Sequence, residues 1–173
     1  MEKRNQTCCF TGHRKIPFLQ AAGIRRRLEQ AIEESIQKGY LYFGAGGALG
    51  YDTIAAQTVL KLREKYPQIK LILVLPCKTQ TRGWTQADID EYERIMAAAD
   101  KVTYTSEEYT RGCMHKRNRH LVDNSSLCIC YLTEGSGGTA YTVDYAKKKG
   151  LRVVNIAREV KHTPKKADAA EDV

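Results

Sequence analysis

The chain has 173 residues, of which 42% are hydrophobic, and its formal net charge is +8. This length fits one ordinary domain with a real core. No run of about 18 apolar residues is present, which excludes a membrane-spanning helix, and the first residues lack the apolar segment of a signal peptide. We therefore expect a cytoplasmic protein whose charge suits anionic partners such as nucleotides or nucleic acids.

The six cysteines form no Cys-x-x-Cys pair and lie mostly in apolar, strand-like segments: Cys8, Cys9, Cys77, Cys113, Cys128 and Cys130. In a reducing compartment such cysteines behave as small buried hydrophobic residues. A zinc site made from Cys113, His115 and His120 would depart from the usual ligand spacings. We expect no metal site and no required cofactor.

The first half of the chain alternates between strand-like and helix-like segments. Residues 7–12 form a β-rich run, and apolar residues at helical spacing then continue to Gly39. Residues 40–46 predict a second strand, which leads into a glycine-rich stretch and a second helix ending near Pro67. Residues 69–76 are almost entirely apolar, which is typical of a parallel strand buried on both faces.

The second half continues the same alternation. Asp88 is a suitable N-cap for a third helix, and residues 101–105 predict a weak fourth strand. A polar helix over residues 112–124 precedes a buried strand at 126–133, and a further helix leads to a last strand at 152–156.

Six alternations of strand and helix predict an α/β fold, namely a parallel sheet with helices on both faces. We expect one domain over residues 1–157. Residues 158–173 are polar and predict a disordered C-terminal tail.

Three glycine-containing stretches follow predicted strands: "TGHR" at residues 11–14, "GAGGALGYD" at 44–52 and "GSGGT" at 135–139. In parallel sheets, ligands bind beyond the carboxyl ends of the strands. A glycine turn before a helix admits a ligand to free backbone N–H groups, which bind phosphate. The predicted ligand-binding residues are Gly12, His13, Arg14, Gly44, Gly46, Gly47, Gly50, Asp52, Trp84, Arg117, Asn118, Gly135, Ser136, Gly137, Gly138 and Thr139.

Several side chains could complete this site. His13 and Arg14 would supply positive charge, and the arginine fork matches phosphate. If residues 112–124 are helical, the side chains of Arg117 and Asn118 point towards the protein interior. We expect those of Lys116 and Arg119 to point into solvent. Trp84 either stacks on a base or covers the core. Five residues are thus added to the glycine turns: His13, Arg14, Trp84, Arg117 and Asn118.

Asp52 has three alternative roles: it holds a ribose hydroxyl pair, caps the helix at Thr53, or acts as the catalytic group of an enzyme. Cleavage of an N-glycosidic bond needs a carboxylate that stabilises the cationic centre or activates water. Asp123 and Glu134 are the other acidic candidates, although Asp123 could pair with Arg119 and Glu134 could be solvated.

Four stretches together resemble the SLOG superfamily, and most closely its YpsA-like branch: "CFTGHR", "GAGGALGYDTIAA", "KRNRHLVDNSSLCICYL" and "GSGGTAYTVDYAKKKG". The resemblance covers about residues 7–156. It implies a Rossmann-like three-layer fold with a mostly parallel six-stranded sheet of order 3-2-1-4-5-6. It also implies a nucleotide-type ligand between residues 44–52 and 135–139, and a homodimer is consistent with such relatives.

Related families imply different functions. The LOG phosphoribohydrolases carry PGGxGTxxE, and this chain has Thr142 where that motif has its glutamate. The DNA-processing protein A family binds single-stranded DNA, and its GxARGID resembles "GGALGYD", with Leu49 in place of the arginine. We therefore expect a protein that binds a nucleotide or nucleotide-derived ligand in a sensor or sequestering role. A nucleotide N-glycosidic hydrolase and a single-stranded DNA-binding protein are the alternatives.

Overall fold

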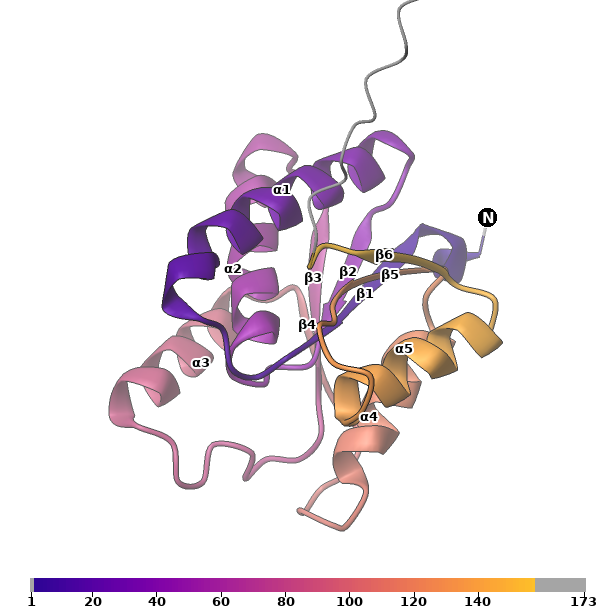
Figure 1. The fold of residues 1–173 in the computed structure, drawn as a ribbon. Coiled ribbons are helices and arrows are strands. Elements are labelled where there is room, and N and C mark those ends of the chain that lie inside the picture. Colours follow the sequence, from indigo (N-terminus) through magenta and orange to yellow (C-terminus); the bar gives the residue numbers. More distant parts are fainter. Residues whose placement is uncertain (1, 158–173) are drawn as a thin grey trace, which may run out of the picture.

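The computed structural model describes residues 2–157, which build a six-stranded sheet between two layers of helices (Figure 1). All neighbouring strands are parallel. The predicted α/β class and Rossmann-like arrangement are confirmed, while the tail predicted at 158–173 lies outside the described residues. The strands are β1 (Thr7–Gly12), β2 (Tyr42–Ala45), β3 (Lys70–Leu75), β4 (Lys101–Tyr104), β5 (Leu127–Tyr131) and β6 (Arg152–Asn155).

The strand order is β4-β3-β2-β1-β5-β6, so one strand lies elsewhere than in the expected order 3-2-1-4-5-6. β4 pairs with β3 at the edge of the sheet, and β5 takes the place beside β1. Burial explains the difference. Every residue of β5 is buried, whereas both ends of β4 are exposed. An interior strand is covered on both faces, and of β4 and β5 only β5 is buried along its whole length.

Helices α1 (Ala21–Gln37), α2 (Tyr51–Lys65) and α3 (Gln86–Ala98) cover one face of the sheet, and α4 (Cys113–Asp123) and α5 (Gly138–Lys148) cover the other (Figure 1). Two short 3-10 segments lie at Lys3–Gln6 and Phe18–Gln20. The cap of α3 differs from the prediction. The Thr85 hydroxyl, rather than Asp88, is the N-cap, and it accepts the Asp88 N–H at 3.2 Å. Within residues 2–157, no helix combines the length and apolar character needed to cross a bilayer.

The larger core lies between the sheet and the α1–α3 layer. The rings of Phe10 and Phe43 stack at 6.2 Å, and the Tyr51 ring meets Phe10 edge-on at 6.5 Å. Tyr51 is fully buried, and its hydroxyl donates to the Ile129 carbonyl at 2.8 Å. This satisfied hydroxyl lets a large ring fill the space beneath the ends of the central strands.

All six cysteines are buried free thiols, as predicted. Cys9 of β1 lies beside Cys128 of β5 in the parallel register. Burial raises the pKa of the Cys8 thiol, and it raises that of Cys130 to about 12. These thiols therefore behave as apolar side chains at the centre of the sheet.

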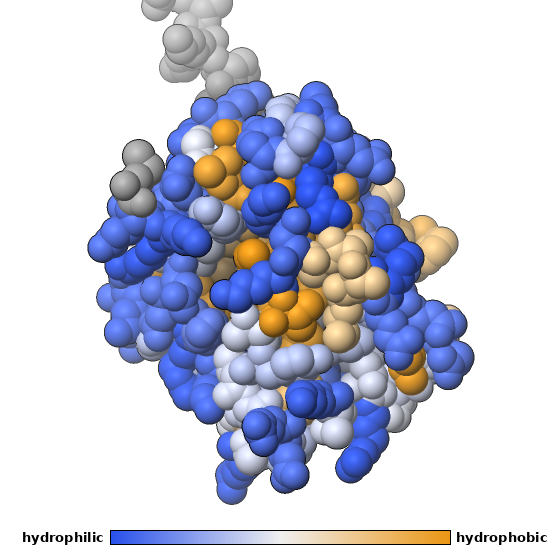
Figure 2. All heavy atoms as spheres, turned by 180° about the vertical axis from the view of Figure 1, so that it is seen from behind, coloured by the Kyte–Doolittle hydropathy of each residue, from blue (hydrophilic) through white to orange (hydrophobic). Residues whose placement is uncertain are grey.

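The back of the molecule is largely hydrophilic, with apolar residues exposed near its centre (Figure 2). A groove of about 470 Å³ opens where α4 leaves the sheet uncovered. Ile72 and Val74 line it, and Lys70 and Lys101 lie where β3 and β4 begin. This groove therefore lies mainly towards the amino ends of the strands, and Gly44 is the predicted ligand-binding residue that lines it.

The packing of Tyr51 under Gly12 gives a stability prediction. A Cβ atom at position 12 would overlap the Tyr51 ring, so Gly12→Ala should lower the free energy of unfolding by about 1–3 kcal/mol in urea denaturation. Gly23→Ala is the matched control, because its Cβ lies inside a helix and approaches only the guanidinium of Arg27, at 3.1 Å from Nη1. The control should be neutral or stabilising. Equal losses in the two variants would contradict this packing.

Candidate functional site

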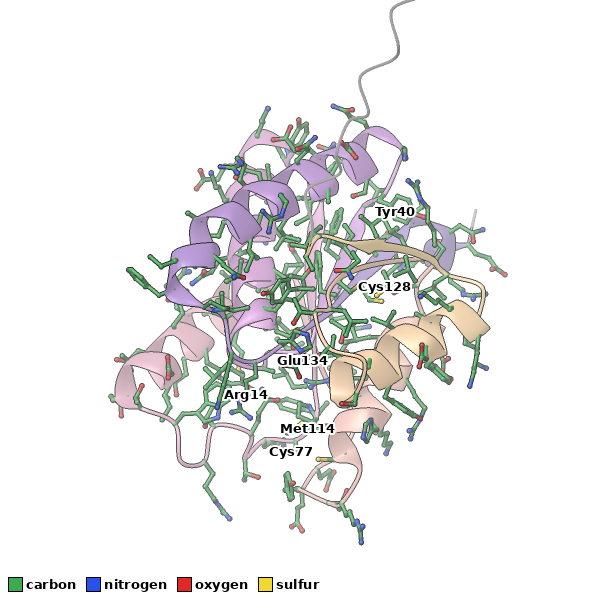
Figure 3. The ribbon with its side chains drawn as sticks, viewed as in Figure 1. Arg14, Tyr40, Cys77, Met114, Cys128 and Glu134 are labelled. Carbon is green, nitrogen blue, oxygen red and sulfur yellow. The ribbon has the colours of Figure 1, made fainter. Side chains whose placement is uncertain are left out.

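The three predicted stretches meet at the carboxyl edge of the sheet. Residues 13–14 follow β1, the first glycine turn (residues 44–52) joins β2 to α2, and the second glycine turn (residues 135–139) joins β5 to α5. Figure 3 shows the side chains of Arg14, Glu134 and Met114 gathered at this end of the molecule. The sequence prediction that these stretches come together is therefore correct.

The first glycine turn is filled by the protein's own atoms. A Cβ atom at Gly46 would lie 2.6 Å from Nη1 of Arg117 and 2.9 Å from Oδ2 of Asp52. Gly50 has a φ of +78°, and a side chain there would overlap the Arg14 backbone. At Gly44 an added Cβ would lie 2.9 Å from the Leu121 side chain. These glycines make room for internal packing.

Asp52 and Arg117 are two buried side chains of opposite charge that both lie next to Gly46. Their exposed fractions are 7% and 4%. Oδ2 of Asp52 accepts the Ala48 N–H at 3.3 Å, while Arg117 donates to the Gly46 carbonyl and, at 2.7 Å, to Oδ1 of Asn118. Because Asp52 belongs to α2 and Arg117 to α4, the pair joins the two helical layers at the end of β2.

Burial is the main influence on both ionisable groups. It raises the pKa of Asp52, although the Arg117 charge and the Ala48 N–H act in the opposite direction. It lowers the pKa of Arg117, and the nearby Asp52 carboxylate partly offsets this effect. Each charge is therefore tolerated at this depth because the other is close by.

Asp52 is not a helix cap, which corrects one of its three alternative roles. Gly50 is the N-cap of α2, and Asp52 is the second residue of the helix. Its carboxylate accepts a hydrogen bond from the preceding turn, and Thr53 donates its hydroxyl to the Ala48 carbonyl at 3.0 Å. These bonds fix the shape of the first glycine turn.

The second glycine turn is open. Residues 133–138 are exposed, and an added Cβ at Gly135, Gly137 or Gly138 would find no atom within 4 Å. α5 begins at Gly138, and its N-cap Gly137 provides no side-chain cap. The first amides of a helix have no partners inside the helix. This turn therefore presents free N–H groups and the positive end of the helix dipole to a ligand.

His13 connects the two sides of the site. Its Nε2 accepts the Thr133 N–H at 2.8 Å, and its ring meets Tyr131 edge-on at 5.5 Å. Through this bond His13 positions the root of the second glycine turn.

Arg14 and Trp84 lie together beside the first glycine turn. Cζ of the exposed Arg14 is 5.7 Å from the Trp84 ring centre, and that ring meets Tyr92 edge-on at 5.5 Å. Trp84 therefore covers Tyr92 and supports a cation that remains accessible to solvent.

Comparison with known proteins identifies the family to which the chain belongs. A protein-family model described as "YpsA: YspA SLOG family" matches residues 8–158 of the sequence. The chain belongs to the YspA SLOG family. This YspA SLOG protein is 32% identical over 141 residues to the uncharacterized SPbeta prophage-derived protein YoqJ of Bacillus subtilis. The matched region covers 74% of this chain and 82% of the relative. The chain is 31% identical to the UPF0398 protein BH1768 of Halalkalibacterium halodurans, over 79% of the chain and 71% of the relative.

Two solved structures share the fold of this YspA SLOG protein. DNA processing protein A (DprA) from Streptococcus pneumoniae superimposes with a TM-score of 0.64 at 18% identity, over 87% of this chain and 50% of that chain. DNA processing protein A from Helicobacter pylori, a structure that concerns its single-stranded DNA binding mode, gives a TM-score of 0.62 at 18% identity, with coverages of 87% and 64%. The chain thus spans half to about two thirds of these proteins.

The remaining carboxylates of this YspA SLOG protein differ in their surroundings. Asp123 accepts the Tyr145 hydroxyl at 2.7 Å in place of the suggested pairing with Arg119. Glu134 is exposed. Thr142 is buried, and its hydroxyl donates to the Gly138 carbonyl at 2.9 Å. Among the described residues, no three His, Cys, Asp or Glu side chains are grouped so as to hold a metal ion.

Gln80 contributes to the site and was not predicted. It lies in the loop after β3, is 8% exposed, and donates from Nε2 to the Gly47 carbonyl at 2.7 Å. Its Oε1 is buried without a partner among residues 2–157. A polar residue in a loop carries no sequence signal that distinguishes it from solvated neighbours.

The buried pair predicts a pH-dependent loss of stability. Arg117→Met should lower the free energy of unfolding by about 3 kcal/mol at pH 8, because Asp52 keeps its charge without a partner. A carboxyl whose pKa is higher in the folded than in the unfolded state favours folding only while protonated. The loss should therefore shrink as the pH falls to 5, as measured by urea unfolding at both pH values.

The double variant Arg117→Met/Asp52→Asn is the control for that experiment. Without an ionisable group at position 52, the double variant should not recover stability relative to the wild type as the pH falls from 8 to 5. A pH-independent loss in the single variant would show that Asp52 and Arg117 are not coupled.

Proposed function

We propose that this YspA SLOG protein binds a nucleotide or nucleotide-derived molecule at the second glycine turn, in a sensor or sequestering role. The observation that carries the proposal is the open start of α5. Gly135, Gly137 and Gly138 have free space above them, and no side chain caps the helix. An open glycine turn at a helix N-terminus favours a phosphate group.

The first glycine turn would form the other side of the ligand site. Asp52 and Arg117 fix its backbone at Gly46, and Gln80 fixes it at Gly47. The exposed Arg14 offers a charge to an anionic ligand. In this arrangement Arg14 provides the positive charge for the ligand, and Asp52 with Arg117 fixes the backbone shape of the first glycine turn.

The surroundings of the carboxylates favour binding over hydrolysis. Asp52 is buried and hydrogen-bonded, Asp123 is engaged by Tyr145, and Thr142 stands where a LOG enzyme has its glutamate. Incubation with nucleoside monophosphates and NAD should therefore release no base, as followed by liquid chromatography. Release of a base that Asp52→Asn abolishes would instead establish the hydrolase.

Gly138→Asp tests the binding proposal. Isothermal titration calorimetry with AMP, ADP, ATP and NAD should identify a nucleotide that binds the wild type, and the variant should bind it at least tenfold more weakly. The reason is that a carboxylate would occupy the place of the phosphate. An aspartate in the first turn of a helix favours the helix, so unfolding would not explain the loss.

Gly138→Ala is the matched control, because its Cβ meets no atom within 4 Å and adds no charge. It should retain most of the affinity. Equal affinity of Gly138→Asp and the wild type would disprove the proposed site. If no nucleotide binds and none co-purifies with the protein in mass spectrometry, the nucleotide proposal itself is wrong.

Single-stranded DNA binding is the second candidate function. The net charge of +8 and the DprA-like fold support it. Binding of this kind depends on phosphate neutralisation, so the affinity for an oligothymidylate should fall steeply between 50 and 200 mM salt. An absence of binding at low salt in fluorescence anisotropy would exclude this candidate.

A further inference from the structure

A second concave site lies beside the open turn, between the start of α4 and the first turn of α5. It has a volume of about 360 Å³. Its lining includes no carboxylate, and the charged residues in it are Arg111, Lys116 and Arg119. Three cations around one hollow repel one another, and an anion within it would relieve that repulsion.

These cations have few partners of their own. Nζ of Lys116 lies 3.5 Å from the Ser106 hydroxyl, and Nη1 of Arg119 donates to the Tyr141 hydroxyl at 3.4 Å. Both distances are at the long limit for a hydrogen bond. Because Lys116 and Arg119 are three residues apart on α4, their side chains lie on neighbouring parts of the helix surface. They can act together on one bound group.

The start of α4 adds to the positive character of the pocket. Its N-cap is Gly112, which has left-handed backbone angles and no side chain to cap the first amides. Nδ1 of His115 is buried and has no hydrogen-bond partner among the described residues. The His115 ring meets the Tyr141 ring edge-on at 4.5 Å, which holds the start of α4 against α5.

Tyr141 connects this pocket to the second glycine turn. Its amide donates to the Gly137 carbonyl at 3.0 Å, so it belongs to the first turn of α5, and its side chain lines the pocket. One turn of a helix rises about 5.4 Å. The start of α5 and the pocket therefore lie at neighbouring places along the first turn of the same helix.

We propose that the pocket around Lys116 and Arg119 is a phosphate subsite, so that the ligand carries a chain of two or more phosphates. This inference rests on the proposed function, because it extends the same site. The first phosphate occupies the start of α5. A later phosphate lies in the pocket, where the planar fork of an arginine and the point charge of a lysine both suit it.

The test compares ligands that differ only in phosphate number. Calorimetry should show that Lys116→Gln/Arg119→Gln binds ATP and ADP at least tenfold more weakly than the wild type does, and AMP less than threefold more weakly. Inorganic tripolyphosphate should bind the wild type and displace ATP, because it supplies the phosphate chain without a base. The double variant should lose tripolyphosphate binding as well.

Lys148→Gln is the control, because this exposed lysine in the last turn of α5 carries the same charge far from the pocket. It should leave every affinity within threefold. Equal losses for AMP and ATP, no loss in the double variant, or no binding of tripolyphosphate to the wild type would each overturn the subsite.

The two proposals fail differently. If AMP binds and responds to Gly138→Asp while Lys116→Gln/Arg119→Gln changes nothing, the nucleotide site stands and the subsite is wrong. If Gly138→Asp changes no nucleotide affinity, the proposed function is wrong. Tripolyphosphate binding that depends only on Lys116 and Arg119 would then define an independent anion pocket and disprove the chain-length inference.

Discussion

The close approach of Asp52 and Arg117 to Gly46 is the constraint on which the carboxyl edge of the sheet depends. A carboxylate from α2 and a guanidinium from α4 reach the same backbone position from opposite layers. Only a residue without a side chain leaves space for both. The cost of removing each charge from water is offset by the other charge and by hydrogen bonds to Ala48 and Gly46. This arrangement fixes the loop after β2 and makes it a rigid neighbour of the second turn.

The two glycine-rich turns therefore have different structural roles. In the first turn, the missing side chains allow charged and apolar groups of the protein to pack against its backbone. In the second turn, the space above the glycines stays open to solvent. His13 connects them through its bond to the Thr133 amide, so the open turn is anchored at its root while its glycines remain exposed. One turn provides rigidity, and the other provides access.

Local patterns predicted the alternation of elements and the meeting of three stretches at one edge. They could not place β4 in the sheet, because the sequence of a weak strand does not indicate which strand it pairs with. The exposure of Lys101 and Tyr104 in the structure explains why β4 lies at the edge. Thr85 and Asp88 are both good N-cap residues, so the choice depended on the path of the loop. The helical period correctly placed Lys116 in solvent, but it carries no information about α5 and therefore did not predict the pocket that Lys116 lines. Composition alone also could not tell a filled glycine turn from an open one.

The position of the cysteines has a practical consequence for following the protein in solution. Cys8 and Cys9 on β1 and Cys128 and Cys130 on β5 are buried where these two neighbouring interior strands pair. A thiol reagent reacts with the exposed thiolate, so these positions are protected until the strands separate. The rate of labelling therefore measures how often the middle of the sheet opens, without any added dye or engineered residue. The native cysteines therefore act as built-in probes of local opening in the interior of the sheet.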